Sequence, residues 1–222
     1  MFSSPFPNII SFICGDFSLS KSINLLSEEK KILESFRSRK RKEEFKLGRS
    51  VAHLALKKFE LESIPILRNL KTHEPCWPKS VMGSITHSGN FAAAAVGLTK
   101  DISGIGIDLE DLSRKINYKI SRHICVDGEL NWLEKLNPEQ ANFNLRIIFS
   151  AKESIFKCHF PISRTFFNFK DAYVKINENK PEFSYILSNT CSKIIAAGYS
   201  RKGLFSVKDN FILTSTYTKN LQ

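Results

Sequence analysis

The sequence predicts an α+β fold made of two successive halves. Each half contains a helical pattern followed by strand-like segments joined by short turns, which is typical of helices packed on antiparallel sheets. With 222 residues, of which 42% are hydrophobic, the chain can bury a sizeable core in one domain or in two small ones. We place the boundary after residue 112, so the predicted domains are residues 1–112 and 113–222.

The first half opens with a strand-like segment at residues 9–12. A helical pattern then runs from Ser27, the expected N-cap, to about Glu60, with acidic residues in its first turn. Three strands are expected after it, because turn residues at 88–90 and 99–101 separate three apolar runs. These predicted strands are residues 81–85, 91–96 and 104–109.

The second half begins with a short helix expected at residues 128–136. A long helix follows, which Asn137 caps and Pro138 begins, and which reaches about Phe160. Proline suits the first helical position because the N–H that it lacks would have no helical partner there. Strands are then expected at residues 172–176, 183–187, 193–199 and 211–217.

Two carboxylates share one face of the strand predicted near residue 107. In residues 104–110, isoleucine and leucine alternate with glycine, Asp108 and Glu110, which is the period of a half-buried strand. On its own, such a pattern is more often the solvated face of a strand. Its alternative is a pair of oxygen donors that converge on one ligand.

The long helix of the second half carries a polar stripe that includes Ser150, Glu153 and Lys157 beside an apolar one. Glu153 and Lys157 lie one turn apart, and such a pair is ordinarily a surface ion pair worth a few tenths of a kcal/mol. Lys152 falls inside the apolar stripe, so we expect it to snorkel or to pair with a carboxylate in a structural role.

The net charge of +11 is concentrated in one region, and a basic cluster of this kind favours a polyanionic partner. A solvated helix face is the alternative interpretation. A nucleic-acid partner is disfavoured, because the run has no interleaved stacking aromatics and no DNA- or RNA-binding motif accompanies it. The cluster comprises Arg37, Arg39, Lys40, Arg41, Lys42, Lys46 and Arg49.

The sequence favours a cytoplasmic protein without a transmembrane segment. No apolar run approaches the ~20 residues that span a bilayer, and the first residues lack the charged start of a signal peptide. An odd number of cysteines without Cys-x-x-Cys spacing argues against disulfides or a zinc site, so we expect reduced thiols. The five are Cys14, Cys76, Cys125, Cys158 and Cys191.

Four segments, taken in order, resemble the sequences of a known family. They are residues 41–49 (RKEEFKLGR), 74–88 with EPCWP and GSITHS, 106–110 (GIDLE) and 149–157 (FSAKESIFK). In these segments the chain resembles the Sfp-type 4′-phosphopantetheinyl transferases, most closely the enterobactin synthase component D subgroup. The resemblance implies a fold of two halves related by a pseudo-two-fold axis, with the active site between them.

The resemblance implies a transferase that moves the 4′-phosphopantetheine arm of coenzyme A to a serine of an apo carrier protein. Asp108, Glu110 and Glu153 would hold Mg²⁺, which prefers oxygen ligands, at the pyrophosphate of coenzyme A. Lys157 would contact a phosphate or act as a base. The general base stays open among Glu153, Lys157 and a metal-bound water.

The resemblance also implies which residues bind coenzyme A. His87 matches the family histidine that contacts a phosphate, although a lone histidine after a strand is more often a turn residue. The subgroup often has an arginine before Glu-Pro-x-Trp-Pro, where this chain has Thr72 and His73, so Lys71 becomes a possible substitute. The predicted coenzyme A residues are Arg41, Arg49, Lys71, Ser84, Thr86, His87, Asp108 and Lys157.

Three functions remain in view. The first is a monomeric, Mg²⁺-dependent enzyme acting on peptidyl, aryl or acyl carrier domains, for enterobactin-like siderophore or other nonribosomal peptide synthesis. The second is an inactive coenzyme A-binding regulator of the same fold. The third is a basic nucleic-acid-binding protein, whose binding would depend steeply on salt.

Overall fold

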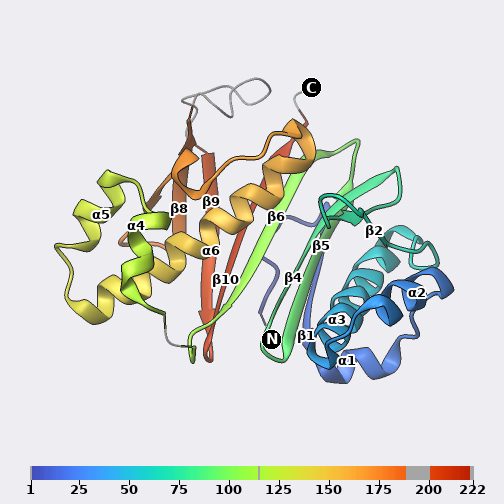
Figure 1. Ribbon diagram of the computed structural model, residues 1–222. Coiled ribbons are helices and arrows are strands. Elements are labelled where there is room, and N and C mark those ends of the chain that lie inside the picture. Colours follow the sequence, from blue (N-terminus) through green and yellow to red (C-terminus); the bar gives the residue numbers. More distant parts are fainter. Residues whose placement is uncertain (1, 115, 189–200, 221–222) are drawn as a thin grey trace. The chain divides into compact units, whose positions relative to one another are not determined.

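The computed structural model describes residues 2–114, 116–188 and 201–220 (Figure 1). The chain divides into two compact units, one formed by residues up to Ile105 with those from Thr218 onward, the other by Gly106–Tyr217. This division places Asp108 and Glu110 in the second unit. None of the helices in the described ranges is long and apolar enough to cross a membrane.

Unit 1 is built on a three-stranded antiparallel sheet in the order β1-β5-β4. These strands are β1 (Ile10–Asp16), β4 (Val81–Ser88) and β5 (Phe91–Leu98). The apolar face of a long helix packs on this sheet, with Leu47, Val51 and Leu56 buried against Ala92 and Ala94 of β5. The small alanine side chains leave room for the helix to lie close to the strand.

The prediction of one continuous helix from Ser27 to about Glu60 is wrong, because two separate helices occupy this region. The chain is extended at Phe36 and Ser38, and the Ser38 hydroxyl accepts a hydrogen bond from the Arg41 N–H at 3.4 Å, which starts a new helix. Ser27 is the first helical residue and not the N-cap, which is Leu26. The Glu29 carboxylate accepts a hydrogen bond from the backbone N–H of Leu26. The helical elements are α1 (Phe17–Ser22), α2 (Ser27–Ser35), α3 (Arg39–Leu56) and the 3₁₀ turn η1 (Lys57–Phe59).

A two-stranded ladder of unit 1 was not predicted, since two residues are too few to show a period. It pairs β2 (Leu67–Arg68) with β3 (Pro75–Cys76), and Arg68 lies opposite Pro75. In the connecting turn, the Asn69 side chain accepts hydrogen bonds from the backbone N–H groups of Lys71 and Thr72, and His73 has a left-handed backbone with φ 63°.

Most of a five-stranded sheet in the order β6-β10-β9-β8-β7 belongs to unit 2, the exceptions being the first residues of β6 and the last of β10. The strands are β6 (Ile102–Asp111), β7 (Ala172–Ile176), β8 (Glu182–Leu187), β9 (Arg201–Lys208) and β10 (Phe211–Lys219). The strands expected at 172–176, 183–187 and 211–217 are therefore confirmed, whereas β9 was not predicted. The strand expected at 193–199 lies outside the described residues.

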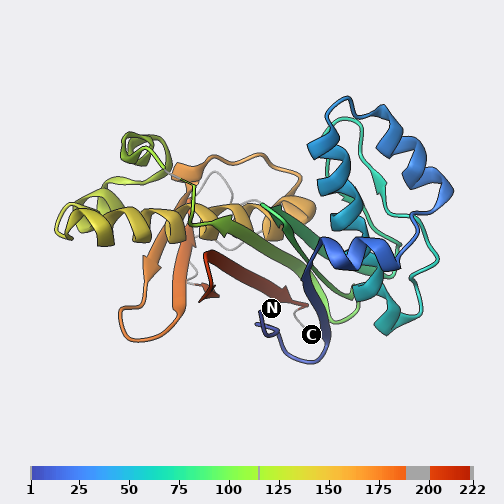
Figure 2. The same ribbon diagram turned by 90° about the horizontal axis from the view of Figure 1, so that it is seen from below.

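A 26-residue helix, α6 (Pro138–Ser163), lies along one face of this sheet (Figure 2). Its predicted start is confirmed, because the Asn137 side chain accepts from the Gln140 N–H at 2.9 Å and Pro138 is the first helical residue. Leu145, Ile148 and Ile155 are buried against the strands. The shorter helical elements are η2 (Tyr118–Ile120), α4 (Ser121–Ile124), α5 (Asp127–Leu133) and η3 (Phe169–Asp171).

Helix α6 approaches β6 closely at Gly106. A Cβ atom at this position would overlap the backbone carbonyl of Ser154, so only glycine fits. The α+β class is thus confirmed, with a long helix packed on an antiparallel sheet in each unit. Cys14, Cys76 and Cys125 have free thiols, and Cys158 is buried in the core of unit 2. Cys191 lies outside the described residues, so reduced thiols throughout remain a prediction.

A buried histidine makes unit 2 sensitive to acid. His159 Nε2 lies 2.8 Å from the Tyr185 hydroxyl, and burial lowers the pKa of His159 to about 3. The unfolded chain takes up this proton near pH 6.5 and the folded protein does not, so stability falls as the pH drops from about 6.5 toward 3. We expect a loss of about 2 kcal/mol from this group at pH 5.

The measurement is the free energy of unfolding in urea at pH 7 and pH 5. His159→Phe should reduce the difference between the two pH values, since Tyr185 keeps its contact with Thr216 at 3.1 Å. His123→Phe, at an exposed position, is the matched control and should keep the wild-type difference. Equal pH dependence in all three proteins would contradict this account.

Candidate functional site

Asp108 of β6 and Lys157 of α6 form the centre of a polar group in unit 2. Asp108 is 6% exposed; its carboxylate accepts hydrogen bonds from the Ser150 hydroxyl at 2.9 Å and from the Lys157 ammonium at 2.6 Å. Lys157 also donates to the Ile107 carbonyl at 3.2 Å. Helical spacing makes Lys157 a neighbour of Glu153, but the structure directs its ammonium to Asp108.

Glu110 and Glu153, the two other predicted metal ligands, interact electrostatically with Asp108. Burial, followed by the charge of Asp108, raises the pKa of Glu110 to about 7, while Lys157 opposes the shift. Burial also raises the pKa of Glu153, with Lys157 opposing and Asp108 adding to the shift. Three carboxylates therefore repel one another, while Lys157 and, for Glu110, Arg114 oppose the rise in pKa.

No three acidic, histidine or cysteine side chains in the described ranges are grouped closely enough to form a ready-made metal site. The predicted set of Asp108, Glu110 and Glu153 nevertheless suits Mg²⁺ in its chemistry, since all three supply oxygen donors. Burial is the main cause of the raised pKa of Glu110, and a cation would relieve the repulsion from Asp108 that adds to it. Mg²⁺ at these residues remains a prediction.

Unit 1 has a pocket of about 210 Å³ that brings together three of the predicted coenzyme A residues, Arg41, Arg49 and His87. The His87 side chain is 43% exposed, with Nδ1 4.0 Å from the Glu44 carboxylate. Sequence reasoning missed most of the other residues here. The full lining is Phe36, Arg41, Glu44, Phe45, Gly48, Arg49, Arg68, His73, Pro75, Ile85 and His87.

Three other predicted coenzyme A residues are not among those that line the pocket. Ser84 and Thr86 are 3% and 4% exposed and alternate with Ile85 and His87 along β4, so they point to the opposite face of that strand. Lys71 is exposed in the turn between β2 and β3. The assignment of these three residues to coenzyme A stays a prediction.

Lys152 takes the structural role that its position predicts. Its ammonium is buried and donates to the Glu129 carboxylate at 2.7 Å and to the Ile124 carbonyl at 2.8 Å. Glu129 also accepts the N–H groups of Val126 and Val174. The predicted pairing with a carboxylate is confirmed.

An apolar hollow of about 280 Å³ adjoins Glu153 in unit 2, and the sequence analysis did not anticipate it. Phe166, one of its lining residues, is 76% exposed. The sequence signal for this hollow is the phenylalanine-rich segment at 166–169, but the spacing of its residues does not indicate a cavity. The lining residues are Lys152, Glu153, Phe156, Phe166, Phe167, Asn168, Phe169 and Ala172.

Comparison with known protein families gives two matches. Residues 28–97 match the family model of the 4′-phosphopantetheinyl transferase N-terminal domain. Residues 104–208 match that of the 4′-phosphopantetheinyl transferase superfamily. The Asp108 group lies within the second match, and the pocket residues Phe36 to His87 lie within the first.

Individual relatives agree with these matches. The chain is 28% identical to 4′-phosphopantetheinyl transferase PptT of Mycobacterium tuberculosis, over 79% of this chain and 78% of that protein. It is 31% identical to 4′-phosphopantetheinyl transferase Svp of Streptomyces mobaraensis, over 65% of this chain and 58% of that one. It is 36% identical to enterobactin synthase component D of Escherichia coli, over 54% and 55%.

A solved structure with some similarity is the holo-[acyl-carrier-protein] synthase of Thermotoga maritima. The similarity has a TM-score of 0.43 and 18% sequence identity, and it covers 54% of this chain and 65% of that one.

Proposed function

The chain belongs to the 4′-phosphopantetheinyl transferase superfamily, and from this premise we propose that it transfers the 4′-phosphopantetheine arm of coenzyme A to a serine of apo carrier proteins. The other product is 3′,5′-ADP. The observation that carries the proposal is the coupled group of Asp108, Glu110, Glu153 and Lys157 inside the matched segment. We further propose that the enzyme works as a cytoplasmic monomer.

Asp108, Glu110 and Glu153 would hold Mg²⁺ in this proposal. When bound, the ion would neutralise charge on the pyrophosphate and make its phosphorus easier to attack. Lys157 holds the Asp108 carboxylate in place through its 2.6 Å ion pair, and the Ser150 hydroxyl fixes the other oxygen. The protein thus holds the Asp108 carboxylate in a fixed orientation, and the pKa values of the other two carboxyl groups, Glu110 and Glu153, are raised.

The transfer step requires a proton acceptor. The serine oxygen of the carrier protein forms a bond to the β-phosphorus, the bond from that phosphorus to 3′,5′-ADP breaks, and the serine proton moves to Glu153. A glutamate whose pKa is raised by burial holds a proton better near neutral pH than an ordinary one. Lys157 already donates to Asp108 and Ile107, which favours Glu153 as the base.

Each unit, taken by itself, has a feature that suits part of coenzyme A. The pocket of unit 1 offers the Arg41 guanidinium and the His87 imidazole to phosphate groups. The apolar hollow of unit 2 beside Glu153 suits the uncharged pantetheine arm.

The test is to incubate the protein with coenzyme A, Mg²⁺ and apo carrier proteins and to measure intact masses. Transfer adds the phosphopantetheine mass to the carrier. Binding of coenzyme A without a mass change would indicate an inactive regulator. Binding of DNA or RNA, with no response to coenzyme A, would indicate a nucleic-acid-binding protein.

We also propose that the carriers belong to siderophore or other nonribosomal peptide synthesis. We expect a higher kcat/KM on peptidyl and aryl carrier domains than on the fatty-acid carrier protein. An enzyme of net charge +11 should also attract acidic carriers, so rates at low carrier concentration should fall as added salt shortens the Debye length, about 10 Å at 0.1 M. A preference for the fatty-acid carrier would contradict the pathway and leave the chemistry standing.

A further inference from the structure

Two arginines of the unit 1 pocket lie on the same aromatic ring. The guanidinium carbon of Arg68 lies 5.4 Å from the centre of the Phe36 ring, and that of Arg41 lies 6.0 Å from it. Desolvation and then the charge of Arg41 lower the pKa of Arg68, so each cation is close enough to affect the other. Two guanidiniums gathered at one ring of the pocket lining suit a dianionic phosphate.

Glu44 is the acidic residue in this lining, and its carboxylate has other neighbours. One oxygen lies 3.8 Å from the Lys40 ammonium and the other lies 4.0 Å from His87. The contacts described for Glu44 therefore join its carboxylate to Lys40 and His87.

The β2–β3 ladder explains how Arg68 reaches this place. Arg68 lies opposite Pro75, so it stands across the ladder from the Glu-Pro segment of the sequence. His73 lies in the turn that connects the two strands of the ladder. Both Arg68 and His73 line the pocket, so the ladder brings the Arg68 guanidinium to it from β2.

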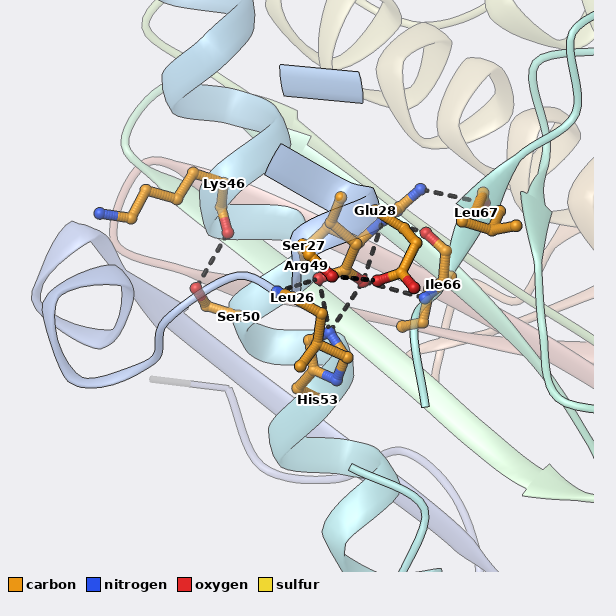
Figure 3. Close-up of polar contacts among 10 residues, drawn as sticks. Leu26, Ser27, Glu28, Lys46, Arg49, Ser50, His53, Ile66 and Leu67 are labelled. Carbon is orange, nitrogen blue, oxygen red and sulfur yellow. Dashed lines mark hydrogen bonds and ion pairs between the residues drawn. The ribbon is translucent and has the colours of Figure 1, made fainter. Parts of the chain in front are cut away.

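A buried pair of charges holds the backbone just before Arg68. The Glu29 carboxylate, which is 0% exposed, accepts the Ile66 N–H at 2.9 Å and also contacts His53 Nε2 at 2.8 Å. Arg49 Nε donates to the Ile66 carbonyl at 2.9 Å, and its Nη2 donates to the Leu67 carbonyl at 3.3 Å (Figure 3). The N–H of Ile66 is thus bound by Glu29 of α2, and its carbonyl by Arg49 of α3.

Arg49 differs from Arg41 in what its guanidinium does. It is 6% exposed, its Nε lies 4.0 Å from Glu29, and two of its nitrogens donate to backbone carbonyls. Through these hydrogen bonds, Arg49 supports the backbone at the start of β2.

We propose that Arg68 acts with Arg41 to bind a phosphomonoester dianion, the 3′-phosphate of coenzyme A, and that Glu29 and Arg49 are positioning residues that act through the Ile66–Leu67 backbone. The inference rests on the proposed function for the identity of the ligand. It changes the role expected of Arg49 from a direct phosphate contact to support of Arg68.

The test compares binding of adenosine 3′,5′-bisphosphate and adenosine 5′-monophosphate by calorimetry, without any transfer reaction. Arg68→Ala and Arg41→Ala should each weaken bisphosphate binding by about 10- to 100-fold and leave the monophosphate nearly unchanged, as expected for one charge-assisted contact. Arg39→Ala is the matched control, because Arg39 is in the same helical turn, is 92% exposed and pairs with Glu43. It should bind like the wild type.

The positioning role is tested in the same assay with Arg49→Lys and Glu29→Gln. Each should lower the preference for the bisphosphate in the wild type but not in an Arg68→Ala background, where the positioned group is absent. A purely structural role would weaken both nucleotides equally. If Arg49→Lys does not fold, Glu29→Gln, which keeps the shape of the side chain, decides the question.

The possible outcomes separate this inference from the proposed function. If the wild type prefers the bisphosphate through Arg68 but transfers nothing to carriers, the phosphate site stands and the transferase proposal falls. A loss on both nucleotides in Arg68→Ala, or no loss on either, would overturn the assignment of Arg68 whatever the transfer assay gives.

Discussion

Replacing Asp108 by asparagine is expected to reduce kcat/KM for transfer by about 10²- to 10³-fold or more, the range found when one charge-stabilising group is removed from an active site. Asparagine keeps the shape of the side chain and can still accept the Ser150 hydroxyl, so the fold should survive. It loses the negative charge that pairs with Lys157 and that would ligate Mg²⁺. Glu153→Gln should be at least as damaging, because it removes a ligand and the proposed base.

The matched control for Asp108→Asn is Asp111→Asn in the same strand. The Asp111 carboxylate accepts the backbone N–H and the hydroxyl of Ser113, and an asparagine oxygen can still accept the N–H. This variant should keep near-wild-type activity. Thermal unfolding with and without Mg²⁺ provides a second measurement, since the stabilisation by Mg²⁺ should vanish only in the Asp108 and Glu153 variants. Near-normal turnover of Asp108→Asn would show that the metal is elsewhere.

Replacing Lys152 by methionine should cost about 3–5 kcal/mol in the free energy of unfolding, because it leaves the buried Glu129 carboxylate without its cation. Both side chains are 1% exposed, so water cannot replace the lost contact. Urea unfolding gives the measurement. Lys135→Met, at an exposed position in the same unit, is the control and should change stability by less than about 0.5 kcal/mol.

The double variant Lys152→Met with Glu129→Gln distinguishes loss of the pair from loss of packing. It removes the uncompensated charge and keeps an oxygen for the N–H of Val126 or Val174, so we expect it to recover part of the lost stability. No recovery would mean that the methionine side chain itself does not fit the core.

Local signals in the sequence predicted the elements on which the Asp108 group stands. Asn137 and Pro138 mark the start of α6 because capping depends on adjacent residues only. Alternation around Asp108 predicted β6 because a strand with an apolar face repeats every second residue. The two-residue ladder of β2 and β3 is too short for any such period.

The misses at the candidate sites share one physical cause, which is contact between distant parts of the chain. Helical periodicity describes neighbours within α6, so it pointed Lys157 toward Glu153; the ion pair with Asp108 depends on packing against β6. Arg68 is an isolated basic residue in the sequence and gains its significance from Phe36, which lies more than 30 positions earlier. The break before Arg39 was missed because good helix formers lie on both sides of Ser38.

The contact between β6 and α6 at Gly106 has a consequence for redesign of the enzyme. The distance between Asp108 and Lys157 depends on the packing of the Gly106 backbone, two residues before Asp108, against the backbone of Ser154 in α6. Even one methyl group at position 106 would collide with the Ser154 carbonyl. A directed-evolution library should therefore hold position 106 fixed as glycine. Diversity is better placed at exposed Phe166, one of the residues that line the apolar hollow, where changes in size can alter which substrates fit without moving the strand.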